Sequence, residues 1–161
     1  NSERDRAHRM PHPGTFNANP ISLAAGIACL KIIATGEPHR KANAAADIIR
    51  QGMHAAIQER GISGFCYGDA SMFHVYLGET DKDPTSYSKL PAATSETLFK
   101  GGNAAAMSNL RKQMLFNGVD CWLRIGICSM AHDAEDIDKT IEEFSKGLDA
   151  IIEDGVAPLR I

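Results

Sequence analysis

The stretch DAEDIDKTIEEFSKGLDAI, residues 133–151, has the pattern of an amphipathic helix. Its large apolar residues recur at steps of three and four, which places them in one stripe along a helix. Asp133 is a good N-cap, and acidic residues fill the first turn, where the helix dipole favours them. We therefore predict a helix that starts after Asp133 and packs this stripe into a core. The stripe consists of Ile137, Ile141, Phe144, Leu148 and Ile151.

A stretch rich in aromatic and β-branched residues, FCYGDASMFHVYL at residues 65–77, predicts β structure. Gly68 and Asp69 interrupt it, and both residue types are common in turns. We therefore expect a strand or a short hairpin, best formed over residues 72–77.

A second stretch of this kind, CWLRIGICS at residues 121–129, predicts another strand. Alternation along the strand would place Trp122, Arg124 and Gly126 on one face, where the small residue at 126 leaves room beside the arginine for a ligand. The opposite face, expected to pack under the helices, would carry Leu123, Ile125 and Ile127.

Residues 20–36 predict a helix near the other end of the sequence. Asn19 is a good N-cap, Pro20 suits the first helical position, and Gly36 suits the C-terminal end. Ala, Ile and Leu occupy nearly every side of this helix. We therefore expect it to be buried on most sides.

Two further helices are predicted from apolar residues spaced by three and four. One begins at Glu37 and ends at Gly61, and the other includes residues 107–114 and ends at Asn117. Residues 78–102 lack this periodicity and predict a long loop. The order helix, helix, strand, loop, helix, strand, helix predicts an α+β fold with helices packed on a small sheet.

The composition limits the classes of partner. The chain has 161 residues, of which 43% are hydrophobic and 23% charged, which suits one globular domain. Its formal net charge of -3 does not favour binding to nucleic acid. The longest apolar run, residues 21–34, is interrupted and too short to span a membrane. We expect neither nucleic acid nor membrane as a partner.

The four cysteines, Cys29, Cys66, Cys121 and Cys128, form no C-x-x-C pair and no zinc-type spacing. We therefore expect reduced thiols and a cytoplasmic location. The sequence opens without Met and without the apolar stretch of a signal peptide, so we also expect a piece of a longer protein.

No cluster of residues predicts a metal site or a serine-hydrolase site. His8 and His12 are four residues apart, but the prolines that flank His12 forbid the helix that would align them. The G-x-S-x-G motif is absent, and the K-G-G stretch at residues 100–102 lacks the frame of a phosphate loop. We expect no metal.

One loop, GTFNANP at residues 14–20, has the composition of an anion site. It offers a glycine that allows close approach, the hydroxyl of Thr15 and two short amides just before a helix N-terminus. The same residues are typical of a capped helix entry. From the residues alone both interpretations remain open.

The run HPGTFNANPISLAAGIACLKII at residues 12–33 closely resembles a segment of class III pyridoxal-phosphate enzymes, the aminotransferase family typified by glutamate-1-semialdehyde 2,1-aminomutase. Three later stretches resemble the same family in the same order, so the resemblance extends over about residues 12–146. They are ASMFHVYLG (70–78), NGVD (117–120) and CSMAHDAEDIDKTIEEF (128–144).

The resemblance implies the C-terminal small domain of a fold-type I enzyme, with a mainly antiparallel sheet preceded by a long linking helix. It also implies pyridoxal 5'-phosphate as the cofactor and a homodimer as the assembly. Gly14 and Thr15 correspond to family residues at the cofactor phosphate, which Thr15 would contact across the dimer interface. Residues 1–36 would hold this loop and the linking helix, and residues 37–161 the small domain.

The family's catalytic lysine, which forms a Schiff base with the cofactor, lies before the G-T-F stretch. The resemblance therefore implies that this chain lacks that lysine, contains no catalytic residue and is inactive alone. Lys100 follows Thr15 in the sequence, so it does not match the family's lysine.

Two departures from the family pattern leave the reaction open. Ala70 stands where the family has glycine, and alanine restricts the backbone more. Arg124 falls near a glutamate of the aminomutases, whereas several class III transaminases use an arginine in a similar strand to bind the substrate carboxylate. Arg124 is thus either a carboxylate-binding residue or a strand arginine in a surface ion pair.

The function implied by the resemblance is the movement of an amino group on a small amino acid, as in glutamate-1-semialdehyde 2,1-aminomutase. One alternative is a class III transaminase that acts on another amino acid. Another is a non-catalytic interaction domain that keeps the family fold.

Overall fold

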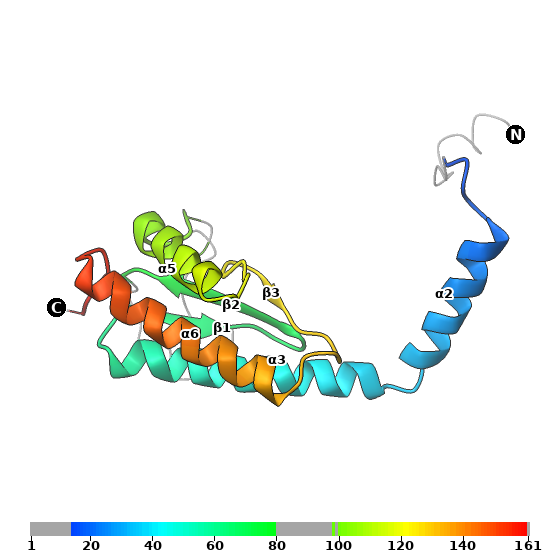
Figure 1. Cartoon of the computed structure of the whole chain (residues 1–161), viewed down its shortest axis with the longest axis horizontal. Coiled ribbons are helices and arrows are strands. Elements are labelled where there is room, and N and C mark those ends of the chain that lie inside the picture. Colours follow the sequence, from blue (N-terminus) through cyan, green and yellow to red (C-terminus); the bar gives the residue numbers. More distant parts are fainter. Residues whose placement is uncertain (1–13, 80–97, 99, 161) are drawn as a thin grey trace, which may run out of the picture. The chain divides into compact units, whose positions relative to one another are not determined.

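The computed structural model describes residues 14–79, 98 and 100–160. The chain divides into two compact units, Asn1–Gly36 and Glu37–Ile161 (Figure 1). Among the described residues, the first unit contains the helix α2. The second contains the helices α3, α5 and α6 and a three-stranded sheet.

Helix α2 (Pro20–Ile33) begins where the sequence predicts. The Asn19 side-chain oxygen accepts hydrogen bonds from the backbone N–H groups of Ile21 (3.0 Å) and Ser22 (3.3 Å). The predicted burial is not found in the single chain, because all residues of α2 are exposed there. An apolar sequence favours burial, but burial also needs neighbours that pack on the helix.

Three helices of the second unit, α3 (Glu37–Glu59), α5 (Ala104–Phe116) and α6 (Ala134–Glu153), match the predicted ones. Helix α6 packs against both α3 and α5. Its start is a capping box: Asp133 accepts from the Asp136 N–H (3.0 Å), and the Asp136 side chain accepts from the Asp133 N–H (3.3 Å). The predicted N-cap is confirmed.

The sheet has the strand order β1 (Gly64–Tyr67), β2 (Met72–Leu77) and β3 (Gly126–Ile127), and both pairs are antiparallel. Strands β1 and β2 form the predicted hairpin, and α3 packs against both of them (Figure 1). The predicted α+β fold, with helices packed on a small antiparallel sheet, is confirmed.

The predicted strand over residues 121–129 is wrong except for its two residues in β3. Its first part forms a turn, in which the Ile125 N–H donates to the Trp122 carbonyl (2.8 Å). The turn is attached to β2, because the Val75 N–H donates to the Leu123 carbonyl (2.8 Å). A run of apolar residues does not distinguish a strand from a turn that packs against a neighbouring strand.

The predicted faces of this stretch are wrong for the same reason. Leu123 is buried, whereas Ile125 and Ile127, expected on the same face, are exposed. The space expected beside Gly126 is filled by the ring of Phe73, which would lie 2.1 Å from a Cβ at position 126. The turn interrupts the alternation that a continuous strand would have kept.

The core of the second unit lies between the helices and the sheet. Most of the predicted loop at 78–102 lies outside the described residues. In the described part of the chain, no single helix is both long and apolar enough to cross a membrane, and only α2 and α3 taken together reach that length and composition. The largest fully buried side chains include Met53, Ile57, Phe65, Leu77, Leu110, Phe144 and Leu148.

Candidate functional site

The turn that precedes α2 is held by backbone hydrogen bonds. The Asn17 N–H donates to the Gly14 carbonyl, and the Asn19 N–H donates to the Phe16 carbonyl (both 3.2 Å). A Cβ at position 14 would lie 2.9 Å from the Asn17 side-chain oxygen, so glycine allows this close approach. The turn therefore holds Thr15 in a defined backbone conformation.

Thr15 is exposed, and neither its hydroxyl nor its N–H forms a hydrogen bond with another described residue. The Phe16 N–H is also without a partner in the described ranges. The first N–H groups of α2, in contrast, are already bonded to the Asn19 side chain. The capped helix entry is thus present, and the donors available to an anion are those of Thr15 and Phe16.

Arg124 lies in the turn that replaces the predicted strand. Its carbonyl accepts a hydrogen bond from Nδ1 of His74, whose ring stacks on Tyr67 with a centroid distance of 5.0 Å. Its side chain is exposed and forms no ion pair with any residue that the structure describes. The interpretation as a surface ion pair is therefore not supported within the described chain.

Gly101 makes room for Arg124. It adopts a φ of +78°, and a Cβ at this position would lie 1.5 Å from Nη2 of Arg124. The adjacent Gly102, at φ +68°, instead approaches β2, where a Cβ would lie 2.3 Å from the Leu77 carbonyl oxygen. Sequence reasoning missed both roles, although a Gly-Gly pair is itself a sign of close backbone contact.

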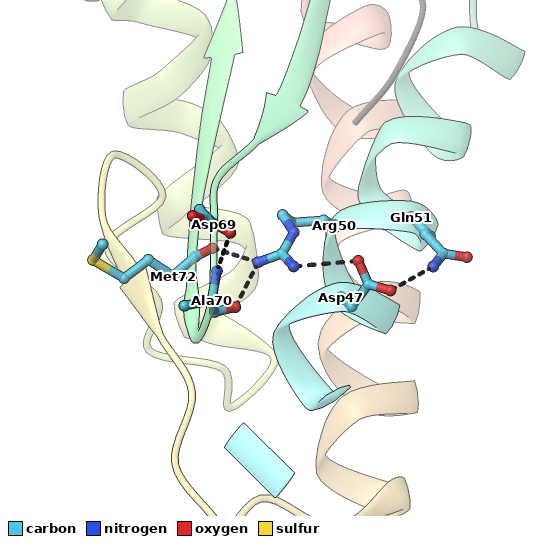
Figure 2. Close-up of polar contacts among 6 residues, drawn as sticks. All are labelled: Asp47, Arg50, Gln51, Asp69, Ala70 and Met72. Atoms are coloured by element: carbon cyan, nitrogen blue, oxygen red, sulfur yellow. Dashed lines mark hydrogen bonds and ion pairs between the residues drawn. The ribbon is translucent and has the colours of Figure 1, made fainter. Parts of the chain in front are cut away.

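Arg50 is a buried arginine of α3 that holds the turn between β1 and β2 (Figure 2). Its Nη1 donates to the carbonyls of Ala70 (2.9 Å) and Met72 (2.7 Å), and its Nη2 donates to Asp47 (3.2 Å). Sequence reasoning also missed this residue. Helical spacing indicates which face a side chain lies on, but not which distant carbonyls it reaches.

The other candidates do not form a site in the described part of the chain. His8 and His12 lie outside the described residues, and no group of three metal-ligating side chains occurs within them. Burial raises the pKa of the Cys66 thiol and raises the pKa of Cys121 to about 11. These thiols are therefore poor nucleophiles at neutral pH.

Comparison with known proteins identifies relatives over most of the chain, although no family model matches it. The chain is 32% identical over 136 residues to glutamate-1-semialdehyde 2,1-aminomutase of Pyrobaculum aerophilum. It is 27% identical over 143 residues to the enzyme of that name from Methanopyrus kandleri. The two alignments cover 83% and 86% of this chain. These matches confirm the resemblance to the class III pyridoxal-phosphate enzymes.

Solved structures of transaminases share the fold. One is a transaminase with PLP bound, which matches with a TM-score of 0.68 and 27% identity over 91% of this chain and 31% of its own. Another is an omega-transaminase from Sphaerobacter thermophilus, with a TM-score of 0.65 and 22% identity over 87% of this chain and 30% of its own. The chain spans about 30% of the length of the curated relatives that it matches.

Ala70 stands where the family resemblance leads us to expect glycine. Its φ of +49° lies in the left-handed region, which glycine enters without the steric penalty that a Cβ causes. The Ala70 N–H donates to the Asp69 side chain (2.8 Å), and its carbonyl accepts from Arg50. The turn between β1 and β2 therefore keeps an unfavourable backbone conformation with contacts on both sides.

Proposed function

We propose that this chain is part of a pyridoxal-phosphate-dependent enzyme that moves an amino group on a small amino acid. The observation that carries the proposal is the match, at 27% identity over 91% of the chain, to a transaminase with PLP bound. The names of the curated relatives favour an aminomutase. Arg124 favours the second candidate, a class III transaminase that acts on another amino acid. A cytoplasmic location accompanies the proposal as a prediction.

In this proposal the turn at Gly14 and Thr15 anchors the cofactor phosphate. The exposed hydroxyl of Thr15 and the N–H groups of Thr15 and Phe16 are donors of the kind that phosphate oxygens accept from, so these residues fit the group. When bound, pyridoxal phosphate supplies the electron sink for amino-group chemistry. The contribution of this chain is to hold and orient it.

The phosphate belongs to the neighbouring subunit of a homodimer, as the family resemblance implies. The exposed apolar side chains of α2 support this, because a helix with such residues on several sides favours cover by another surface. Thr15 precedes α2 by only a few residues, so an interface that covers the helix would include the turn. Those apolar side chains are Ile21, Leu23, Ile27, Leu30 and Ile32.

Arg124 binds the substrate carboxylate in this proposal. A guanidinium can donate two parallel hydrogen bonds to a carboxylate, which fixes orientation as well as charge. Gly101 lets the side chain lie against the backbone, which limits the positions that the guanidinium takes.

The proposal also holds that the 161-residue chain alone is inactive, because the family resemblance places the catalytic lysine before the G-T-F stretch, whereas Lys100 follows it. Incubation with pyridoxal phosphate, reduction with borohydride and peptide mass spectrometry test this statement. We expect no stoichiometric pyridoxyl label on the chain. A stable label on Lys100 would contradict both this assignment and the inactivity of the chain.

The phosphate role is tested by Thr15→Ala in the protein that contains this chain. Affinity for the cofactor should fall about ten- to a hundredfold, because one hydrogen bond to a charged group contributes about 1.5–3 kcal/mol. Thr15→Ser keeps the hydroxyl and is the matched control. If titration with pyridoxal phosphate gives equal affinities for wild type and Thr15→Ala, Thr15 is only a residue of the helix entry.

The carboxylate role is tested by the kinetics of Arg124→Ala. KM for amino-acid substrates should rise by about one to two orders of magnitude, on the order of 2 kcal/mol, whereas amines that lack the carboxylate should be nearly unaffected. Arg124→Lys keeps the charge without the bidentate geometry, so its KM should lie between those of wild type and Arg124→Ala. An equal loss for both substrate types would assign Arg124 to structure.

A further inference from the structure

A cavity of about 610 Å³ lies between α5 and the turn that carries Arg124. This volume is typical of small-molecule sites, which enclose roughly 300–1,000 Å³. Helix α5 packs Leu110 and Met114 into the core and lines the cavity with a neighbouring face, which includes Ser108 and Leu115. Residues 122–124, in the turn, form the opposite wall.

Apolar side chains form much of the wall. Leu115 is 50% exposed and Trp122 is 59% exposed, and both line the cavity together with the buried Met107. Exposed apolar side chains that gather in a concave site favour a ligand with an apolar body. The indole of Trp122 adds a flat face that suits a ring.

Among the residues that the structure describes, the charged side chains that line this cavity are cations. None of the described lining residues is acidic, although Asp120 forms an ion pair with Arg111 nearby (3.6 Å). The chain as a whole carries a formal charge of -3, so this cluster is a local exception that attracts anions. The four lining cations are Lys100, Arg111, Lys112 and Arg124.

Arg124 is held at the cavity by its surroundings. Its guanidinium lies against Gly101, where a Cβ would come within 1.5 Å of Nη2. Its turn is bonded to β2 through the carbonyls of Leu123 and Arg124. A cation on a fixed turn loses less conformational freedom on binding than one on a mobile segment.

We propose that this cavity binds a small organic acid whose carboxylate contacts Arg124 and whose apolar body, of the size of one ring, packs against Trp122 and Leu115. The inference rests on the proposed function in one respect, the role of Arg124, and deepens it. It restricts the substrate to amino acids that carry an apolar group.

Trp122 allows a direct test, because it is the only tryptophan of the 161 residues. Its fluorescence reports binding without cofactor and without activity. Phenylacetate is the probe, 2-phenylethanol its neutral counterpart, and acetate its counterpart without the ring. We expect phenylacetate to shift the emission saturably and both counterparts to bind at least about tenfold more weakly. Added salt should weaken the binding of phenylacetate.

Matched variants identify the contacts. Arg124→Gln should weaken phenylacetate binding at least about tenfold, and Leu115→Ser several-fold. Arg40→Gln removes an exposed arginine of α3 that does not line the cavity, and it should bind like wild type. Circular dichroism checks that each variant is folded. The absence of a saturable shift, or equal binding by wild type and Arg124→Gln, overturns the inference.

The outcomes separate this inference from the proposed function. If phenylacetate binding depends on Arg124 and phenylacetate competes with the amino-acid substrate, both statements stand. If phenylacetate binding depends on Arg124 but phenylacetate does not compete with the amino-acid substrate, the cavity is a binding site for organic acids. Its role in the substrate site is then overturned. If Arg124→Ala raises KM but phenylacetate does not bind, the role of Arg124 in binding the substrate carboxylate stands. The proposal that this cavity binds a small organic acid is then overturned.

Discussion

Helices α2 and α6 both start at a side-chain cap and both carry large apolar residues, but only α6 is buried along one side. In α6 these residues form a single stripe, in which Phe144, Leu148 and Ile151 are fully buried. In α2 they lie on several sides and none is buried; Ile21, for example, is 81% exposed. The two helices therefore obtain their stability in different ways.

The difference shows what hydrophobic periodicity predicts. A single stripe needs neighbours on one side, and α3 and α5 supply them to α6. A helix that is apolar on several sides is recognised as a helix from its cap and composition, but its neighbours are not specified. The homodimer proposed above would supply such neighbours to α2.

The largest expected effect is on thiol reactivity, which compares the two units directly. Cys29 on α2 is exposed, whereas Cys66, Cys121 and Cys128 are buried in the second unit. With a disulfide reagent at pH 8, Cys29 of the monomeric 161-residue chain should react at the rate of a free thiol. The buried thiols should react at least ~1,000-fold more slowly, because they must wait for unfolding. Fast reaction of a second thiol would contradict the assigned core.

A core substitution in α6 should have the next largest effect. Phe144→Ala should lower the free energy of unfolding by about 3–5 kcal/mol, because it removes a fully buried ring and leaves a cavity. Ile27→Ala in α2 is the matched control, and it should change stability by less than about 0.5 kcal/mol. Urea denaturation followed by circular dichroism measures both. A large loss for Ile27→Ala in the monomeric chain would mean that α2 is covered.

Arg50→Met tests a contact that holds the second unit together without any apolar pattern. The substitution keeps the length of the side chain but removes the donors to the carbonyls of Ala70 and Met72. We expect a loss of about 2–3 kcal/mol in the free energy of unfolding, because hydrogen bonds from a charged, buried donor contribute about 1.5–3 kcal/mol. Arg50→Lys keeps the charge but has fewer donors. Its free energy of unfolding should therefore fall less than that of Arg50→Met. Equal stability of wild type and Arg50→Met would show that the contacts are dispensable.

Removal of the two caps should give the smallest effect of this series. Asp133→Ala breaks the capping box of α6 and should cost about 1 kcal/mol. Asn19→Ala removes the cap of α2 and should fray that helix without changing the unfolding transition of the second unit. Denaturation curves for the two variants provide the comparison, and an equal shift for both would indicate that the units unfold together.

Local rules predicted the helices and the hairpin, because caps, turn residues and periodicity act within a few residues. The same rules failed over residues 121–129, where the first part of an apolar run forms a turn that is hydrogen-bonded to β2. The site could be predicted only in part. The roles of Thr15 and Arg124 were assigned through the family resemblance and stay predictions. Gly101 and Arg50 act through residues distant in the sequence, and nothing in their own neighbourhood specifies those partners.

Ala70 has a consequence for laboratory evolution of this chain. Its left-handed backbone is one that glycine and asparagine tolerate better than alanine. Glycine would remove the clash but also give the unfolded chain more freedom, so the net gain should be at most about 1 kcal/mol. A library randomised at this position and selected for survival at raised temperature should nevertheless enrich these two residues. Enrichment of β-branched residues instead would mean that the turn changes its conformation.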